Sequence, residues 1–172
     1  EVPDSTMHDY GTDHIKSNKV INKINKLTEE LCSKLNEDTL VIVTADHGHL
    51  NCEDILLSDY EDLYNTLDGD VWIEGRMCSF KVKEGMHDTF VKLFNEYFGN
   101  EFILKSKKEI IDEKLFGTGE EHKLFRDSLG DYFGLAISDK FFKYSIYSTD
   151  LVSMHAGFTE DEMRIPLIVI SK

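Results

Sequence analysis

The sequence predicts an α/β fold into which a smaller α+β lobe is inserted. Two apolar runs, at 40–43 and 165–170, have the pattern of strands buried on both faces of a parallel sheet. An amphipathic helix pattern precedes the first run. Between the two runs, strand and helix patterns alternate irregularly, which is typical of an antiparallel α+β lobe.

The first segment, residues 1–14, is polar, loop-like and dense in side chains that bind metals. Asp4 and His8 are four residues apart, so one helical turn or a compact loop points both at a common centre. The simpler alternative is a frayed chain end. Further candidates in this segment have no evident partner: Asp9, Asp13 and His14.

Residues 15–35 predict an amphipathic helix, and residues 36–39 a turn into the strand at 40–43. A helix, a short turn and a buried strand form the second half of a βαβ unit. The first strand of that unit is then expected to end just before Asp4. We therefore expect the chain to begin in the middle of a fold.

Asp46 and His47 directly follow the strand at 40–43, and Gly48 lets the backbone turn sharply after them. Ligands of open α/β sheets bind outside the carboxyl ends of the strands. A carboxylate and an imidazole placed there can hold a borderline metal such as zinc. For an isolated pair, a helix cap at Asp46 and a surface position for His47 are the simpler interpretation.

The pattern in the middle of the chain predicts that residues 70–150 form the inserted lobe. The aromatic residues of this segment are interpreted as the core of the lobe. An acidic, leucine-bearing link with a short helix precedes it at 51–67. The expected strands are 76–83, 102–104, 130–137 and 141–147, and the expected helices are 86–98, 107–115 and 123–128. Residues 1–69 and 151–172 are assigned to the main domain.

Composition excludes several classes of function. The 33 acidic residues outnumber 19 lysines and arginines and give a net charge of −14, which argues against binding to nucleic acid or to an anionic membrane. No apolar run reaches membrane-spanning length, and no signal peptide is visible. Three widely spaced cysteines, an odd number, indicate reduced thiols and a cytoplasmic location: Cys32, Cys52 and Cys78.

Three clusters of metal-binding residues stand out together: Asp4 with His8, Asp46 with His47, and His155 in the loop before the last strand. Two carboxylates and three imidazoles from separate loops are the mixed oxygen and nitrogen set of a two-metal hydrolytic site. In such sites, ions about 3.5–4 Å apart bind the attacking and leaving oxygens of a phosphate.

At these clusters the sequence resembles the alkaline phosphatase superfamily, in its nucleotide pyrophosphatase and type I phosphodiesterase branch. Residues 3–11 are similar to the Pro-Asp-x-x-x-His-x-x-Gly element of that branch, and residues 44–48 to its Asp-His-Gly element. Residues 155–169 resemble its last histidine motif and closing strand. The resemblance covers both ends of the chain well and the middle only loosely.

The resemblance implies an alkaline-phosphatase-like sheet with helices on its faces and a cap-like inserted lobe. It also implies that Asp4, His8 and His155 bind one divalent metal ion and that Asp46 and His47 bind the other. Zinc is the expected metal and manganese the alternative. The threonine or serine nucleophile and a sixth metal ligand lie ahead of the Pro-Asp element in this family, so both are expected upstream of Glu1.

The resemblance thus implies the C-terminal part of a metal-dependent phosphohydrolase that cleaves phosphodiester or pyrophosphate bonds. Its expected partners are a phosphate-ester or nucleotide substrate and the missing N-terminal half of the same protein. The isolated piece is expected to be inactive. The alternatives are a phosphomutase or a sulfatase of the same superfamily, and a non-catalytic metal-binding domain.

Overall fold

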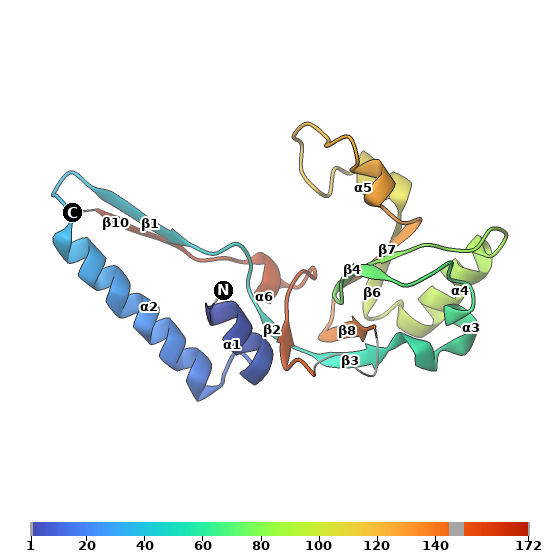
Figure 1. Ribbon diagram of the computed structural model, residues 1–172, viewed down its shortest axis with the longest axis horizontal. Helices are drawn as coiled ribbons and strands as arrows, with labels where there is room; N and C mark the ends of the chain where they lie inside the picture. The colour runs from blue at the N-terminus through green and yellow to red at the C-terminus, as the bar shows by residue number, and fades with distance from the viewer. Residues whose placement is uncertain (1, 145–149, 172) are drawn as a thin grey trace. The chain divides into compact units, whose positions relative to one another are not determined.

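The computed structural model describes residues 2–144 and 150–171, and the chain divides into two units (Figure 1). Unit 1 comprises Glu1–Cys52, Thr149–His155 and Thr159–Lys172, and unit 2 comprises Glu53–Ser148 and Ala156–Phe158. Residues 53–69 lie in unit 2, whereas the sequence pattern groups them with the main domain. The identification of the two units with a metal-binding core and an inserted lobe stays a prediction.

Unit 1 begins with a helix, α1 (Val2–Tyr10), where the sequence pattern predicted a loop. Pro3 lies in the first turn, where an N–H group has no acceptor within the helix, so this proline does not disrupt it. The loop prediction was wrong because it relied on the polar composition of the segment and did not consider that a proline is compatible with the first turn of a helix. Helical geometry places Asp4 and His8 on one face of α1, as their spacing predicted.

The second helix, α2 (Ile15–Lys34), confirms the predicted amphipathic helix. Gly11 makes the turn between the two helices at a φ of 88°, a conformation that favours glycine. The buried Ser17 hydroxyl donates a hydrogen bond to the Gly11 carbonyl at 2.6 Å, which fixes α1 to the start of α2. Among the described residues, no helix has both the length and the apolarity needed to cross a membrane.

The two apolar runs pair with each other, as β1 (Leu40–Thr44) and β10 (Leu167–Ser171), which confirms that they share one sheet. The expected parallel pairing and burial on both faces were wrong. The strands pair antiparallel, and Ile42 on β1 is 56% exposed. Figure 1 shows α2 running alongside this ribbon, and Val41 and Ile170 on one face line a hollow with residues of α2. The opposite face, which carries Ile42, is open among the described residues.

Two short elements complete the frame of unit 1. The strands β2 (Leu50–Asn51) and β9 (Ser153–Met154) pair antiparallel. This pairing brings the loop after β1 next to the segment that precedes α6. A short helix, α6 (Glu160–Met163), precedes β10 and begins with a capping box between Thr159 and Glu162.

Unit 2 contains a four-stranded antiparallel sheet, in the order β4-β5-β7-β6, and a parallel pair, β3 with β8. The expected α+β composition is confirmed, although the predicted helix at 123–128 is only a 3-10 turn at Arg126–Ser128. Residues 145–147 of the predicted strand 141–147 lie outside the described residues. The strands are β3 (Glu53–Leu56), β4 (Trp72–Glu74), β5 (Met77–Phe80), β6 (Phe102–Ser106), β7 (Tyr132–Ala136) and β8 (Lys140–Lys143). The helices are α3 (Glu61–Tyr64), α4 (His87–Phe98) and α5 (Lys107–Asp112), with a further 3-10 turn at Leu57–Asp59.

The core of unit 2 is built from phenylalanine side chains, which confirms that the aromatics form the core of this region. Helix α4 presents every fourth residue to the sheet, and all three of these side chains are buried: Phe90, Phe94 and Phe98. Phe94 lies at the centre, with its ring 5.6 Å from that of Phe80 and 6.1 Å from that of Phe142. The pair with Phe80 is edge-to-face and the pair with Phe142 is tilted, and such aromatic contacts add to the stabilisation that apolar burial provides.

Replacement of Phe94 by alanine is therefore expected to lower the free energy of unfolding of unit 2 by about 3–5 kcal/mol, since a buried ring is lost and a cavity remains. Denaturant unfolding, followed by the fluorescence of Trp72, measures this change. Lys92→Ala, on the exposed face of the same helix, is the control and is expected to change stability by less than about 0.5 kcal/mol. Equal stabilities for the two variants would contradict this description of the core.

Candidate metal centre

Four side chains converge within unit 1: Asp4, His8, His49 and His155. Their potential ligand atoms all lie within 4.8 Å of one another, and they form the only such group found among the described residues. Three of the four were singled out by the sequence pattern, and the expected proximity of His155 to Asp4 and His8 is observed. His49 was missed, although it follows the Asp-His-Gly element directly.

The Asp4 carboxylate is the centre of the cluster. Its Oδ1 atom lies 2.9 Å from Nε2 of His49, 3.4 Å from Nε2 of His8 and 3.5 Å from Nε2 of His155. Nε2 of His47 is slightly more distant, at 3.9 Å. All four imidazoles thus direct the same ring nitrogen toward one carboxylate oxygen.

Strand β9 positions two of the histidines. The backbone N–H of Val152, next to β9, donates to the His8 carbonyl at 2.8 Å, which ties the strand to the last turn of α1. His155 follows β9 directly. Pairing of Leu50 with Met154 then brings the loop that carries His47 and His49 to the same place.

The outer ring nitrogens of His8 and His47 contact carbonyl oxygen atoms. Nδ1 of His8 lies 2.7 Å from the Ser153 carbonyl, and Nδ1 of His47 lies 2.9 Å from the Gly48 carbonyl. A carbonyl oxygen only accepts, so both Nδ1 atoms carry the proton, and in the neutral rings Nε2 presents a lone pair. This is the outer hydrogen-bonding pattern of metal-binding histidines, and it suits the donor set to zinc.

Burial and neighbouring charges shift the pKa values of the cluster. Burial, with a further contribution from the surrounding imidazoles, lowers the pKa of His155 to about 4. Burial also lowers the pKa of His49, and this effect is larger than the opposing effect of the hydrogen bond with Asp4, which raises the pKa. Partial burial raises the pKa of Asp4, but the bond with His49 and the nearby imidazoles outweigh it, so this pKa lies below its ordinary value. At neutral pH, Asp4 is therefore charged while His49 and His155 are neutral, which are the states that bind metal.

Asp46 and His47 lie beside the cluster. The Asp46 side chain is 91% exposed, and its Oδ1 atom is 3.8 Å from Nε2 of His47. The rings of His47 and His155 are stacked, with centroids 3.8 Å apart and planes at 16°.

The further candidate ligands of the N-terminal segment do not join the cluster. Asp9, Asp13 and His14 are exposed and lie outside the four-residue cluster. His14 instead begins α2, where its Nδ1 atom accepts a hydrogen bond from the Lys16 N–H at 3.2 Å.

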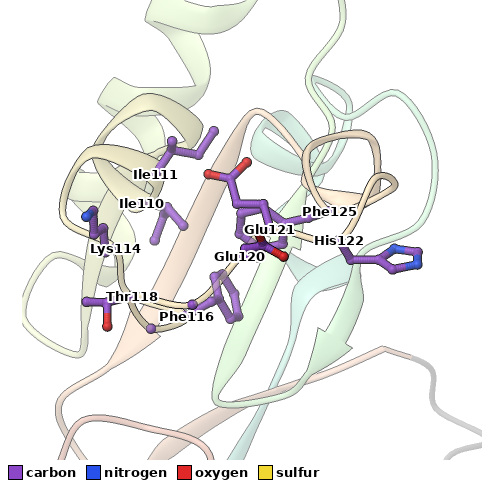
Figure 2. A pocket seen from close by; sticks show the side chains of 11 residues that line it. Ile110, Ile111, Lys114, Phe116, Thr118, Glu120, Glu121, His122 and Phe125 are labelled. Carbon is purple, nitrogen blue, oxygen red and sulfur yellow. The ribbon is translucent and has the colours of Figure 1, made fainter.

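Unit 2 contains a separate cavity of about 310 Å³ (Figure 2). Figure 2 shows apolar side chains of α5 and the following loop on one side and the Glu120–His122 segment on the other. Glu121 forms an ion pair with Arg126 at 2.7 Å, so its charge is already balanced. The cavity holds none of the predicted ligands.

Comparison with known proteins identifies relatives of the chain. The family model for type I phosphodiesterase / nucleotide pyrophosphatase matches residues 1–127. No curated protein sequence matches the chain.

Several solved structures share the fold. Murine ectonucleotide pyrophosphatase / phosphodiesterase 5, in complex with AMP, is 21% identical with a TM-score of 0.71, and the match covers 97% of this chain and 44% of that one. The human protein of the same name is 18% identical with a TM-score of 0.73, covering 98% and 45%. Phosphonoacetate hydrolase from Sinorhizobium meliloti 1021, in complex with phosphonoformate, is 18% identical with a TM-score of 0.66, covering 95% and 43%. The chain thus spans less than half the length of these proteins.

Gly48 supports the centre without contributing a ligand. Its N–H donates to the Glu162 carbonyl at 2.9 Å, and a Cβ atom added to it would lie 1.9 Å from the Asp161 carbonyl oxygen. Gly48→Ala must therefore displace the loop that carries His47 and His49. We expect zinc affinity to fall about 10–100-fold, as when outer contacts of a metal site are lost.

Competition with a chromophoric zinc chelator measures this affinity. The matched control is Gly119→Ala, because an added Cβ meets nothing within 4 Å there. Unchanged zinc affinity in Gly48→Ala would show that the approach of this loop to α6 does not position the centre.

Proposed function

Because the chain belongs to the type I phosphodiesterase / nucleotide pyrophosphatase family, we propose that it is the C-terminal part of a metal-dependent phosphohydrolase. The enzyme cleaves phosphodiester or pyrophosphate bonds. The observation that carries this proposal is the convergence of Asp4, His8 and His155 from the two ends of the chain. A family match alone would not require these three side chains to meet.

Asp4, His8 and His155 hold one divalent ion in this proposal, and Asp46 and His47 hold the other. Zinc is the first choice because mixed imidazole and carboxylate donors suit it, and manganese is the alternative. When bound, the two ions polarise the phosphate oxygens and stabilise the charge that develops on them. Asp4 supplies the anion that holds the positive charge in place, and the carbonyls bonded to His8 and His47 keep their rings oriented.

The substrate class follows from the family and its relatives. The murine and bacterial structures contain AMP and a phosphonate, respectively. We therefore propose a nucleotide or a related phosphate ester as substrate. The family match favours this activity over the phosphomutase and sulfatase alternatives.

The nucleophile is a threonine or serine upstream of Glu1 in this proposal. The N-terminal half that carries it covers the open face of the β1–β10 ribbon. Support comes from the exposure of apolar side chains there, with Leu40 58%, Leu167 71% and Val169 56% exposed. Monomeric proteins rarely leave such a contiguous apolar face in water.

The 172-residue chain is expected to bind at most about one zinc ion tightly, because in the part of the chain that the structure describes only the Asp4 group has three or more potential ligands. It is also expected not to hydrolyse phosphodiesters, since the nucleophile is absent. Zinc stoichiometry after dialysis and release of nitrophenol from bis-nitrophenyl phosphate measure both properties. Metal-dependent turnover by the 172-residue chain would contradict the proposed upstream nucleophile.

In the full-length protein, His47→Ala and His155→Ala are each expected to lower phosphodiesterase activity by more than about 100-fold, the upper range for changes to outer contacts of a metal site. His122→Ala, an exposed imidazole of unit 2, is the matched control and keeps the activity. Full activity in both His47→Ala and His155→Ala would rule out the two-ion assignment.

A further inference from the structure

We propose that His49 is a fourth protein ligand of the ion held by Asp4, His8 and His155. This inference rests on the proposed function, because it refines the metal site of the same phosphohydrolase. It adds a residue that the family resemblance does not supply.

The distances fit a tetrahedral set. Zinc binds imidazole nitrogen and carboxylate oxygen at about 2.0–2.1 Å, so neighbouring ligands of a tetrahedral ion are about 3.3 Å apart. From Asp4 Oδ1, the Nε2 atoms of His49, His8 and His155 lie at 2.9, 3.4 and 3.5 Å. His8 and His155 lie close to this spacing, and His49 is nearer to Asp4, at the distance of a direct hydrogen bond that a shared ion would replace.

His49 is the most deeply buried member of the group. Its side chain is 6% exposed, compared with 18% for His8 and 21% for His155. A buried polar ring needs partners for both nitrogens. In the structure, Nε2 of His49 is hydrogen-bonded to the Asp4 carboxylate. A cation bound by both groups would replace this hydrogen bond.

Ser153 holds the outer nitrogens of two rings in the cluster. Its hydroxyl lies 3.0 Å from Nδ1 of His49, and its carbonyl accepts from Nδ1 of His8 at 2.7 Å. Ser153 itself is fully buried in β9. One residue therefore orients ligands from α1 and from the loop after β1 toward the same point, which is the role of an outer partner in metal sites.

His47 does not occupy this fourth position. Its Nε2 atom is further from Asp4, at 3.9 Å, and its ring is stacked on that of His155. The loop thus supplies one histidine to each ion. With four protein ligands, the ion of Asp4 would bind a phosphate oxygen by expanding to five ligands, as catalytic zinc sites can.

The competing explanation is that His49 only orients Asp4 through their 2.9 Å hydrogen bond. Gln in place of His49 separates the two roles, because its amide can still donate to Asp4 but is a poor zinc ligand. If His49 is a ligand, we expect His49→Gln to weaken zinc binding by more than about 100-fold, beyond the usual range for an outer partner. If His49 only orients Asp4, the variant keeps zinc affinity within about tenfold.

The experiment is a titration of the 172-residue chain and its variants with Zn²⁺, and with Co²⁺ as a visible probe. The native chain should give the intense absorption of four-coordinate Co²⁺, and His49→Gln should lose that intensity as water replaces the imidazole. Ser153→Ala removes only the outer partner of His49 and should keep the four-coordinate spectrum. His122→Gln is the control outside the cluster.

A measurement on the unmutated chain covers the case in which His49→Gln does not fold. Nitrogen-15 NMR of the histidine rings should show the Nε2 resonances of His8, His49 and His155 moving together when zinc is added. A His49 Nε2 resonance that stays at its zinc-free position overturns the inference, as does an unchanged affinity and Co²⁺ spectrum in His49→Gln. If His8→Gln also leaves zinc binding unchanged, the metal site itself fails, and the proposed function fails with it.

Discussion

The geometry of unit 1 depends on the electrostatic balance around the Asp4 carboxylate. Carbonyl acceptors fix a proton of His8 and of His47 on Nδ1, so the Nε2 atom of each ring is the one directed toward the anion. Lone pairs and a carboxylate repel one another at 3.4–3.9 Å unless a proton or a cation lies between them. The low pKa of His155, which results first from burial, disfavours the proton. A divalent cation is the proposed partner, because it would satisfy all of these groups together.

The frame that holds this arrangement is small and made of non-local contacts. Strand β9 joins α1 through the bond from Val152 to His8, and it joins the loop after β1 through its pairing with β2. The Gly48 N–H then fixes the other end of that loop to Glu162, in α6. Each contact links segments far apart in the sequence, so the centre forms only when both parts of unit 1 are folded together.

The sequence predicts those features whose cause is local. Spacing of four residues placed Asp4 beside His8, apolar periodicity identified α2, and unbroken apolar runs identified the two strands of the ribbon. Strand direction could not be predicted, because an unbroken apolar run has no side-chain alternation to reveal its partner. His49 was missed because its role comes from Ser153 and Asp4, contacts at sequence separations of 104 and 45. A second histidine two residues after His47 was the available signal.

In the proposed function, the distribution of the core would give a bound metal a structural role as well as a chemical one. Both clusters of buried apolar side chains lie in unit 2, whereas α1 has no buried residue among those described and α2 buries only Ser17. Unit 1 therefore gains little from apolar burial within the described residues. An ion bound by residues of α1, the loop after β1 and the segment after β9 links three separate parts of the unit. A ligand at 1,000 times its dissociation constant adds about 4 kcal/mol to the stability of the folded state. If the proposed ion is bound, we therefore expect metal binding and folding of unit 1 to be coupled.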